Sequence, residues 1–244
     1  MRRSDGEAIA RDRSLPSSIT GRDALLLLLS LAAGCVDAVS YLGLNQVFTG
    51  NMSGNTVLLG IALGQAEWQA ALRSGVALAG FVAGLAVGAA IVERGREDVT
   101  WPSVVTRGLV LECGVLIALA VVWHFTGRPT GDVVYYLIGL AALAMGVQSA
   151  AVRRLGVGSV ATTYVTGTLT SLTRQIVRRL RSRDPEAPSV RDLELPANVW
   201  IAYVIGAVVG GIAEPRWESA ALSPAISFVA VVVVAAAVLY RRRQ

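Results

Sequence analysis

The chain has 244 residues, of which 54% are hydrophobic and only 16% are charged, and its mean hydropathy is +0.57. Soluble domains carry roughly 25% charged residues, so this composition excludes an ordinary soluble protein and indicates a polytopic membrane protein. The net charge is +5 and every basic residue is an arginine. No basic stripe is interleaved with aromatic residues, so we attribute the arginines to the flanks of membrane spans and expect no nucleic-acid partner.

The N-terminus resembles a secretory signal. Arginines precede the apolar run Leu25–Leu31, and the small residues before Cys35 resemble a lipoprotein cleavage site. The apolar run continues past Cys35 to Leu44, however, which is too long for the roughly 7–15 apolar residues of a cleaved signal. We therefore predict an uncleaved first span after a cytoplasmic tail, residues 1–23, and keep a cleaved, lipidated signal as the alternative.

A bilayer core of about 30 Å requires about 20 helical residues to cross it. Eight apolar segments approach or meet that length: 24–44, 47–63, 70–92, 108–125, 133–152, 159–176, 197–213 and 221–240. The second and the sixth are interrupted by runs of Gly, Ser, Thr and Asn at residues 49–56 and 162–168. The chain is thus predicted to be an all-α membrane helix bundle in which two segments are broken.

Three motifs recur in the same order in the two halves of the chain. The pairs are Gly34-Cys35-Val36-Asp37-Ala38 with Gly146-Val147-Gln148-Ser149-Ala150, Ser53-Gly54-Asn55 with Thr166-Gly167-Thr168, and Gly80-xxx-Gly84 with Gly206-xxx-Gly210. This pattern predicts one integral membrane domain, residues 24–240, built from two copies of a unit, residues 24–126 and 133–240. A short cytoplasmic tail, residues 241–244, follows.

The arginines decide between eight spans and six. If the two broken segments re-enter the membrane instead of crossing it, 19 arginines lie on the inner side and 3 on the outer side. Eight spans divide them less unevenly, so the positive-inside rule favours six spans with both termini in the cytoplasm. Three spans per unit invert the second copy relative to the first, as in many secondary transporters.

The two broken segments are the strongest functional signal. Irregular backbone is tolerated within a membrane only where protein or a watery cavity surrounds it. Residues 54–63 and 167–176 would each form a half-helix of about 15 Å. Their N-termini would face each other at the midplane and favour a polar or anionic group. Ordinary spans that tolerate Gly and Thr are the alternative. The predicted substrate-binding residues are Asp37, Asn51, Ser53, Gly54, Asn55, Gln148, Thr166, Gly167 and Thr168.

Asp37 is a carboxylate in the middle of a span, where it costs about 2.5–3.5 kcal/mol on insertion scales. It must therefore face a cavity or a partner. A proton carrier, a cation site and an anchor for the half-helix at residues 51–55 are the functional interpretations. A structural hydrogen bond to neighbouring backbone is the alternative to all three.

Three further features have structural interpretations. The rows Gly80, Gly84, Gly88 and Gly206, Gly210 are expected to pack spans three and seven within the chain rather than across a dimer. Glu112 lies five residues from Arg107, so we expect an ion-paired or snorkelling interfacial acid. The two cysteines and the single histidine lack disulfide or metal-ligand spacing, and we predict no metal, no cofactor and no enzyme activity.

The residues from Gly34 to Leu42, followed by those from Val47 to Asn55, resemble the YoaK-like family of bacterial membrane proteins, known as domain of unknown function 1275. The residues Met145–Ala150 and Val165–Leu169 resemble its second motif. The resemblance covers roughly residues 24–240. It implies about six spans in a bacterial inner membrane and carries no substrate or mechanism with it.

Together these observations predict an inner-membrane protein that contacts the lipid bilayer and transports a small solute bound near the midplane. A non-transporting membrane scaffold or partner-binding subunit is the rival hypothesis. A polar cavity that reaches Asp37 would favour transport, and a dry packed interface would favour the scaffold. A homo-oligomer is compatible with either.

Overall fold

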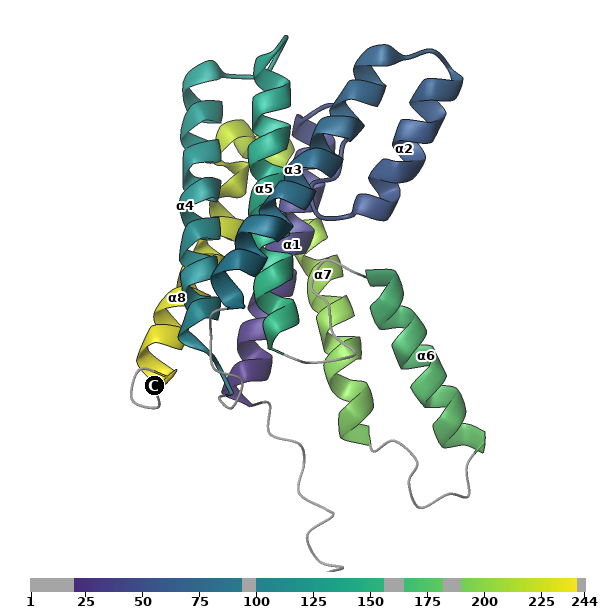
Figure 1. Cartoon of the computed structure of the whole chain (residues 1–244), viewed down its shortest axis with the longest axis vertical. Helices are drawn as coiled ribbons and strands as arrows, with labels where there is room; N and C mark the ends of the chain where they lie inside the picture. Colours follow the sequence, from purple (N-terminus) through teal and green to yellow (C-terminus); the bar gives the residue numbers. More distant parts are fainter. Residues whose placement is uncertain (1–19, 94–99, 156–164, 182–189, 241–244) are drawn as a thin grey trace, which may run out of the picture.

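The computed structural model describes residues 20–93, 100–155, 165–181 and 190–240. These residues form helices and their connections: α1 Gly21–Gly43, α2 Met52–Gly64, α3 Trp68–Val92, α4 Ser103–Thr126, α5 Val133–Arg154, α6 Val165–Arg181, α7 Val190–Trp217, a short 3-10 helix η1 Glu218–Leu222, and α8 Ser223–Tyr240 (Figure 1). Six of the described helices are long and apolar enough to cross a membrane, and α2 and α6 are not among them. The predicted all-α membrane bundle is confirmed.

Helix α1 has defined ends. At its start the Thr20 hydroxyl accepts a hydrogen bond from the Asp23 amide, and the Asp23 carboxylate accepts one from the Thr20 amide, which forms a capping box. At its other end Asn45 and Gln46 both adopt left-handed φ angles of about 60°. These two residues turn the chain back into the bundle. The predicted tails, residues 1–19 and 241–244, lie outside the described residues.

Helices α2 and α6 are the two broken segments. Helix α2 has 13 residues, or about 20 Å, which is too short to cross a core of about 30 Å. Among the described elements, α2 contacts α3 and α6 contacts α7. Figure 1 shows both helices beginning near mid-height and running toward opposite ends of the molecule. Helix α6 is longer than the predicted half-helix, and residues 162–164 of the predicted break lie outside the described part.

The main contacts join helices from the two halves of the chain: α1 packs on α7, and α3 packs on α5. Both interfaces bring backbones together at a glycine. A Cβ atom on Gly34 would overlap the carbonyl oxygen of Tyr203 in α7, and one on Gly146 would overlap that of Phe81 in α3. Only glycine permits such close approach. Gly34 in α1 and Gly146 in α5, which the sequence paired, therefore allow the same close backbone contact.

The glycine rows pack inside the chain as expected, but not against each other. Gly84 lies on the Leu143 carbonyl of α5, and Gly206 lies on the Leu31 carbonyl of α1. No contact between α3 and α7 is found among the described elements. The rows also match with a shift: Gly84 has the environment of Gly206, whereas the sequence alignment had paired Gly80 with Gly206. The shift is four residues, or about one helical turn. Because Gly80, Gly84 and Gly88 repeat every four residues, the sequence alone cannot distinguish the two alignments.

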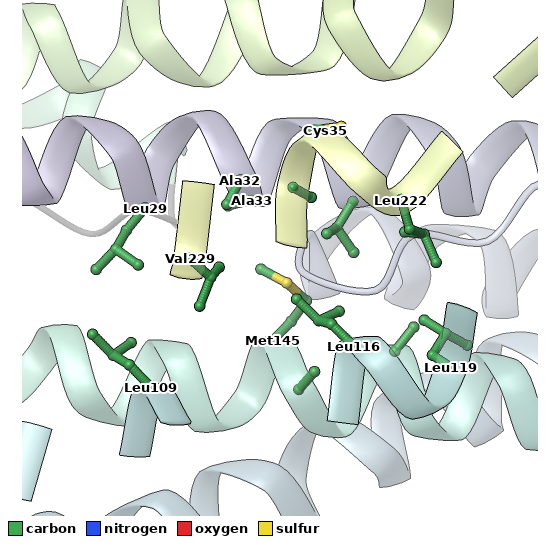
Figure 2. Packing of buried hydrophobic residues seen from close by; sticks show 14 of the residues in the cluster. Leu29, Ala32, Ala33, Cys35, Leu109, Leu116, Leu119, Met145, Leu222 and Val229 are labelled. Carbon is green, nitrogen blue, oxygen red and sulfur yellow. The ribbon is translucent and has the colours of Figure 1, made fainter. Parts of the chain in front are cut away.

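The core of the bundle is apolar and lies between α1, α4, α5 and α8. Figure 2 shows Met145 of α5 between side chains of α1 and Leu116 of α4. The buried stripe of α4 consists of Val105, Leu109, Glu112, Leu116, Leu119 and Trp123, spaced alternately by three and four residues. Side chains with this spacing share one face of a helix.

Glu112 belongs to that stripe, so its expected place at the membrane interface is wrong. Its side chain is 0% exposed, and neither carboxylate oxygen has a hydrogen-bonding partner among the residues that the structure describes. Arg107 is exposed. Five helical residues turn the chain by about 500°, or 140° net, so the two side chains leave the helix on different sides.

Candidate functional site

The candidate site is the segment between α1 and α2, which returns into the bundle beside the last two turns of α1. Its anchor is Asp37, whose side chain is only 2% exposed. The amides of Thr49 and Gly50 donate to Asp37 Oδ1, with N···O distances of 2.9 Å and 2.6 Å. Ser40, one helical turn after Asp37, shares a hydrogen bond of 3.0 Å with the Thr49 hydroxyl. The start of α2 is therefore held at the depth of Asp37.

The second oxygen of Asp37 joins the other half of the chain. The hydroxyl of Tyr203, in the middle of α7, donates to Asp37 Oδ2 at 2.6 Å. Three hydrogen-bond donors thus stabilise the buried carboxylate. Hydrocarbon supplies no such donors. Tyr203 comes close enough because Gly34, one turn before Asp37 on α1, lets the α7 backbone approach. Asp37 therefore links α1, α7 and the entry to α2.

Asn55 fixes the same segment from the α2 side. Its side chain pairs with the backbone of Phe48 in both directions: the Phe48 amide donates to Oδ1 at 3.0 Å, and Nδ2 donates to the Phe48 carbonyl at 2.6 Å. The Phe48 ring stacks on Tyr41 of α1, with ring centroids 4.8 Å apart. Asn55 is 0% exposed. The Asn55 side-chain amide thus satisfies both the backbone N–H and the backbone carbonyl of Phe48, which lies outside any helix.

The N-terminus of α2 is capped by Asn51. Its Oδ1 accepts hydrogen bonds from the Gly54 amide at 3.3 Å and from the Ser53 hydroxyl at 2.9 Å. A Cβ atom on Gly54 would lie 3.0 Å from the Phe48 ring, so the position has little spare room. Ser53 itself is exposed. Of the predicted residues at this helix start, Ser53 is the exposed one, and its hydroxyl donates to Asn51.

The remaining predicted residues lie in the second half. Gln148 of α5 is buried and donates to the Leu29 carbonyl of α1 at 3.1 Å, so it belongs to the α1–α5 contact rather than to the entry segment. Thr168 is 2% exposed in the first turn of α6, as Asn55 is in the first turn of α2. Gly167 is half-buried beside it. Thr166 lies in α6, and its side chain is outside the described part.

Five participants lie outside the predicted list: Ser40, Thr49, Gly50, Tyr203 and the backbone of Phe48. Tyr203 carries a hydroxyl in the middle of a span, and that was the available signal. Its partner is distant in sequence, so only the packing of α1 on α7 reveals the contact. The bonds of Asp37 to Thr49 and Gly50 are those that the anchor interpretation requires, and bonds to backbone amides also fit the structural alternative.

The described residues contain neither a cluster of metal-ligating side chains nor a disulfide. In residues 20–93, 100–155, 165–181 and 190–240, no three His, Cys, Asp or Glu side chains gather as a metal site would require. Cys35 and Cys113 are free thiols in α1 and α4. The polar groups of the site are a helix N-terminus capped by Asn51, the exposed Ser53 hydroxyl that donates to Asn51, and a compensated carboxylate.

Comparison with known proteins gives a consistent family. The model of the family described as "Protein of unknown function (DUF1275)" matches residues 25–238. The UPF0700 transmembrane protein YoaK of Bacillus subtilis (strain 168) is 39% identical over 194 residues, which cover 80% of this chain and 84% of that protein. No solved structure matches. The chain, a multi-pass membrane protein, therefore belongs to the YoaK-like DUF1275 family.

Proposed function

We propose that this protein is a small-solute transporter whose binding site lies between the N-termini of α2 and α6, near the bilayer midplane. The observation that carries the proposal is the entry to α2. It leaves helical geometry beside Asp37, about 9 Å before the end of a spanning helix, where Asp37 holds the Thr49 and Gly50 amides. Discontinuous helices at this depth are typical of secondary transporters, in which they form the substrate site.

The few helix contacts of α2 and α6 support the same proposal. Among the described elements, α2 contacts only α3, and α6 contacts only α7, while the long helices pack on several neighbours. Asp37 of α1 bonds the segment before α2 at Thr49, and Asn55 of α2 bonds the same segment at Phe48. A short helix with one helical neighbour and a polar tether can move without opening the apolar core. We propose that α2 and α6 are the gating elements.

An inverted internal repeat is the architecture that we propose for the bundle. Three observations support it. The α1–α7 interface uses the same glycine packing as the α5–α3 interface, at Gly34 and Gly146. Asn55 and Thr168 are both buried in the first turn of a short helix. Helices α2 and α6 run toward opposite ends of the molecule (Figure 1). The site would then sit on the axis that relates the halves.

We further propose that the protein lies in a bacterial cytoplasmic membrane with both termini inside. With six spans, only Arg73, Arg128 and Arg216 of the 22 basic residues fall on the outer side. Retention of arginine on the cytoplasmic side supports that orientation. The role that we propose is that of a carrier and not of an enzyme. The predicted ligand is a small solute rather than a nucleic acid.

The test is solute uptake by the purified protein in liposomes. The panel contains labelled amino acids, short carboxylates, sugars and polyamines. We expect at least one class to enter faster than it enters protein-free liposomes. Ser53→Leu should abolish that uptake, because it places a bulky apolar side chain at the exposed start of α2 and removes the hydroxyl that bonds Asn51. Gly60→Leu is the matched control, because nothing lies within 4 Å of a Cβ atom there. Absence of uptake across the panel rejects the proposal.

One observation favours the rival function, a non-transporting scaffold or partner-binding subunit. The polar atoms of Asp37 and Asn55 are used within the chain, on Thr49, Gly50, Tyr203 and Phe48. In a scaffold these bonds only hold the re-entrant segment in place. Normal uptake activity in the wild type rules this rival out.

A further inference from the structure

A second polar site lies away from the entry to α2, at the end of the bundle opposite the C-terminus (Figure 1). It is a cleft of about 150 Å³ between the start of α3, the start of α5 and the turn after α1. Five polar residues line it: Asn45, Gln69, Arg73, Asp132 and Tyr135. Pockets for drug-sized ligands measure roughly 300–1,000 Å³, so this cleft admits a molecule of only a few non-hydrogen atoms.

The packing of α3 on α5 creates the cleft. Gly80 lies on the Gly139 carbonyl, and Gly84, one turn later, lies on that of Leu143, so the two helices run side by side in the same direction. Continued two turns toward the N-termini, this register places Arg73 level with Asp132. Large polar side chains replace the glycines there. The helices therefore separate, and the turn containing Asn45 closes the third side.

Arg73 has no polar partner among the residues that the structure describes. Its Nε atom is buried, and no hydrogen bond or ion pair of its guanidinium occurs within the described ranges. Arg73 lies about one and a half turns after the start of α3, and its side chain lines the cleft. A planar guanidinium with free donors binds a carboxylate through two parallel hydrogen bonds.

Asp132 supplies the opposite charge across the same cleft. It occupies the N-cap position of α5 without making a side-chain capping bond, and it is exposed. No ion pair between Asp132 and Arg73 is present in the described part of the chain, although both line the cleft. A cleft with one unpaired cation and one unpaired anion is complementary to a ligand that carries both signs.

We infer that this cleft binds a small zwitterionic amino acid, with its carboxylate on Arg73 and its ammonium group on Asp132. A simple anion would leave Asp132 facing the cleft without a partner, and a simple amine would do the same to Arg73. The amides of Asn45 and Gln69 and the Tyr135 hydroxyl remain for the polar edges of the ligand. Asn45 belongs to the segment that Asp37 holds, so a ligand here would contact the entry to α2.

Thermal unfolding of the detergent-purified protein tests this inference. We expect at least one small member of the twenty common amino acids to raise Tm in a saturable manner. Alanine, propionate and ethylamine form a matched set, because the last two are alanine without its ammonium or carboxylate group. We expect each of these two to bind at least about tenfold more weakly than alanine, since each leaves one charged partner unsatisfied.

Two variants separate the charges. Arg73→Gln should abolish the response to alanine, and Asp132→Asn should make alanine and propionate bind equally. Arg216→Gln is the control, because this arginine is exposed outside the cleft and donates to the Ile212 carbonyl. No shift with any of the twenty amino acids, an unchanged response in Arg73→Gln, or propionate binding as tightly as alanine would each overturn the inference. Binding here without uptake into liposomes would reject only the transport proposal.

Discussion

At Asp37, one side chain joins elements that are far apart in the sequence. Its two oxygens accept from the backbone of the entry segment and from Tyr203 of α7, within a bundle that buries the carboxylate almost completely. Removing one member of such a set leaves buried donors without an acceptor, which costs about 1–3 kcal/mol for each group. The stability of the re-entrant segment should therefore depend on this residue.

We predict a graded series at Asp37. Asp37→Ala should lower the free energy of unfolding by about 3–5 kcal/mol, because it strands the Thr49, Gly50 and Tyr203 donors. Asp37→Asn keeps one acceptor oxygen and should lose less. Tyr203→Phe should lose about 1–2 kcal/mol. Unfolding in mixed micelles measures all three, and equal stability of Asp37→Ala and wild type would contradict the anchor.

Glu112 presents the opposite case, a buried carboxyl group without a described partner. A polar group buried without a hydrogen bond is destabilising by about 1 kcal/mol or more. Glu112→Leu should therefore raise the midpoint of thermal unfolding, since leucine fits the apolar stripe formed by Leu109 and Leu116. Leu116→Ala, one turn away, is the opposite control and should lower stability by about 2–5 kcal/mol. A lower midpoint for Glu112→Leu would show that this carboxyl group has a stabilising partner.

At the scale of the helices, the sequence predicted the six spans and both interruptions, because hydropathy and the Gly, Ser, Thr and Asn runs are local signals. The one pairing that it predicted, span three with span seven, is wrong, because α3 packs on α5 and α7 packs on α1. Gly34 and Gly84 indicate close helix packing, but their partners Tyr203 and Leu143 are known only from the three-dimensional arrangement. The orientation of Glu112 was missed for a related reason: sequence distance from Arg107 does not fix which face meets the core.

The paired interfaces can be compared directly. Gly34→Ala and Gly146→Ala each place a methyl group against a backbone carbonyl and should each lower stability by about 1–3 kcal/mol. Gly114→Ala is the control: nothing lies within 4 Å of the added Cβ atom, and alanine favours the helix. Thermal unfolding of the three variants gives the comparison. A tolerated Gly146→Ala beside a damaging Gly34→Ala would contradict equivalent interfaces.

Helix α2 offers a second comparison within one element. Gly54→Leu must displace the Phe48 ring or Asn51, whereas Gly60→Leu meets open space. We expect Gly54→Leu to reduce monodisperse yield or solute binding, and Gly60→Leu to resemble the wild type. The corresponding change in α6, Gly167→Leu, should resemble Gly54→Leu if the two helix starts flank one site. A wild-type Gly167→Leu would restrict function to the first motif.

For the whole molecule, the proposed arrangement of six spans and two re-entrant helices makes a prediction about sidedness. The turn between α2 and α3, at Ala66, and the end of α3, at Glu93, are both exposed and are separated by one spanning helix. Single cysteines at these positions, in a background without Cys35 and Cys113, should therefore label from opposite sides of the membrane. Because the arginines are concentrated beyond Glu93 and at the termini, position 66 should react with an impermeant maleimide in intact cells. Position 93 should react only after permeabilisation. If α2 crossed the membrane, the two positions would exchange sides relative to the N-terminus, and labelling at position 93 in intact cells would contradict the six-span topology.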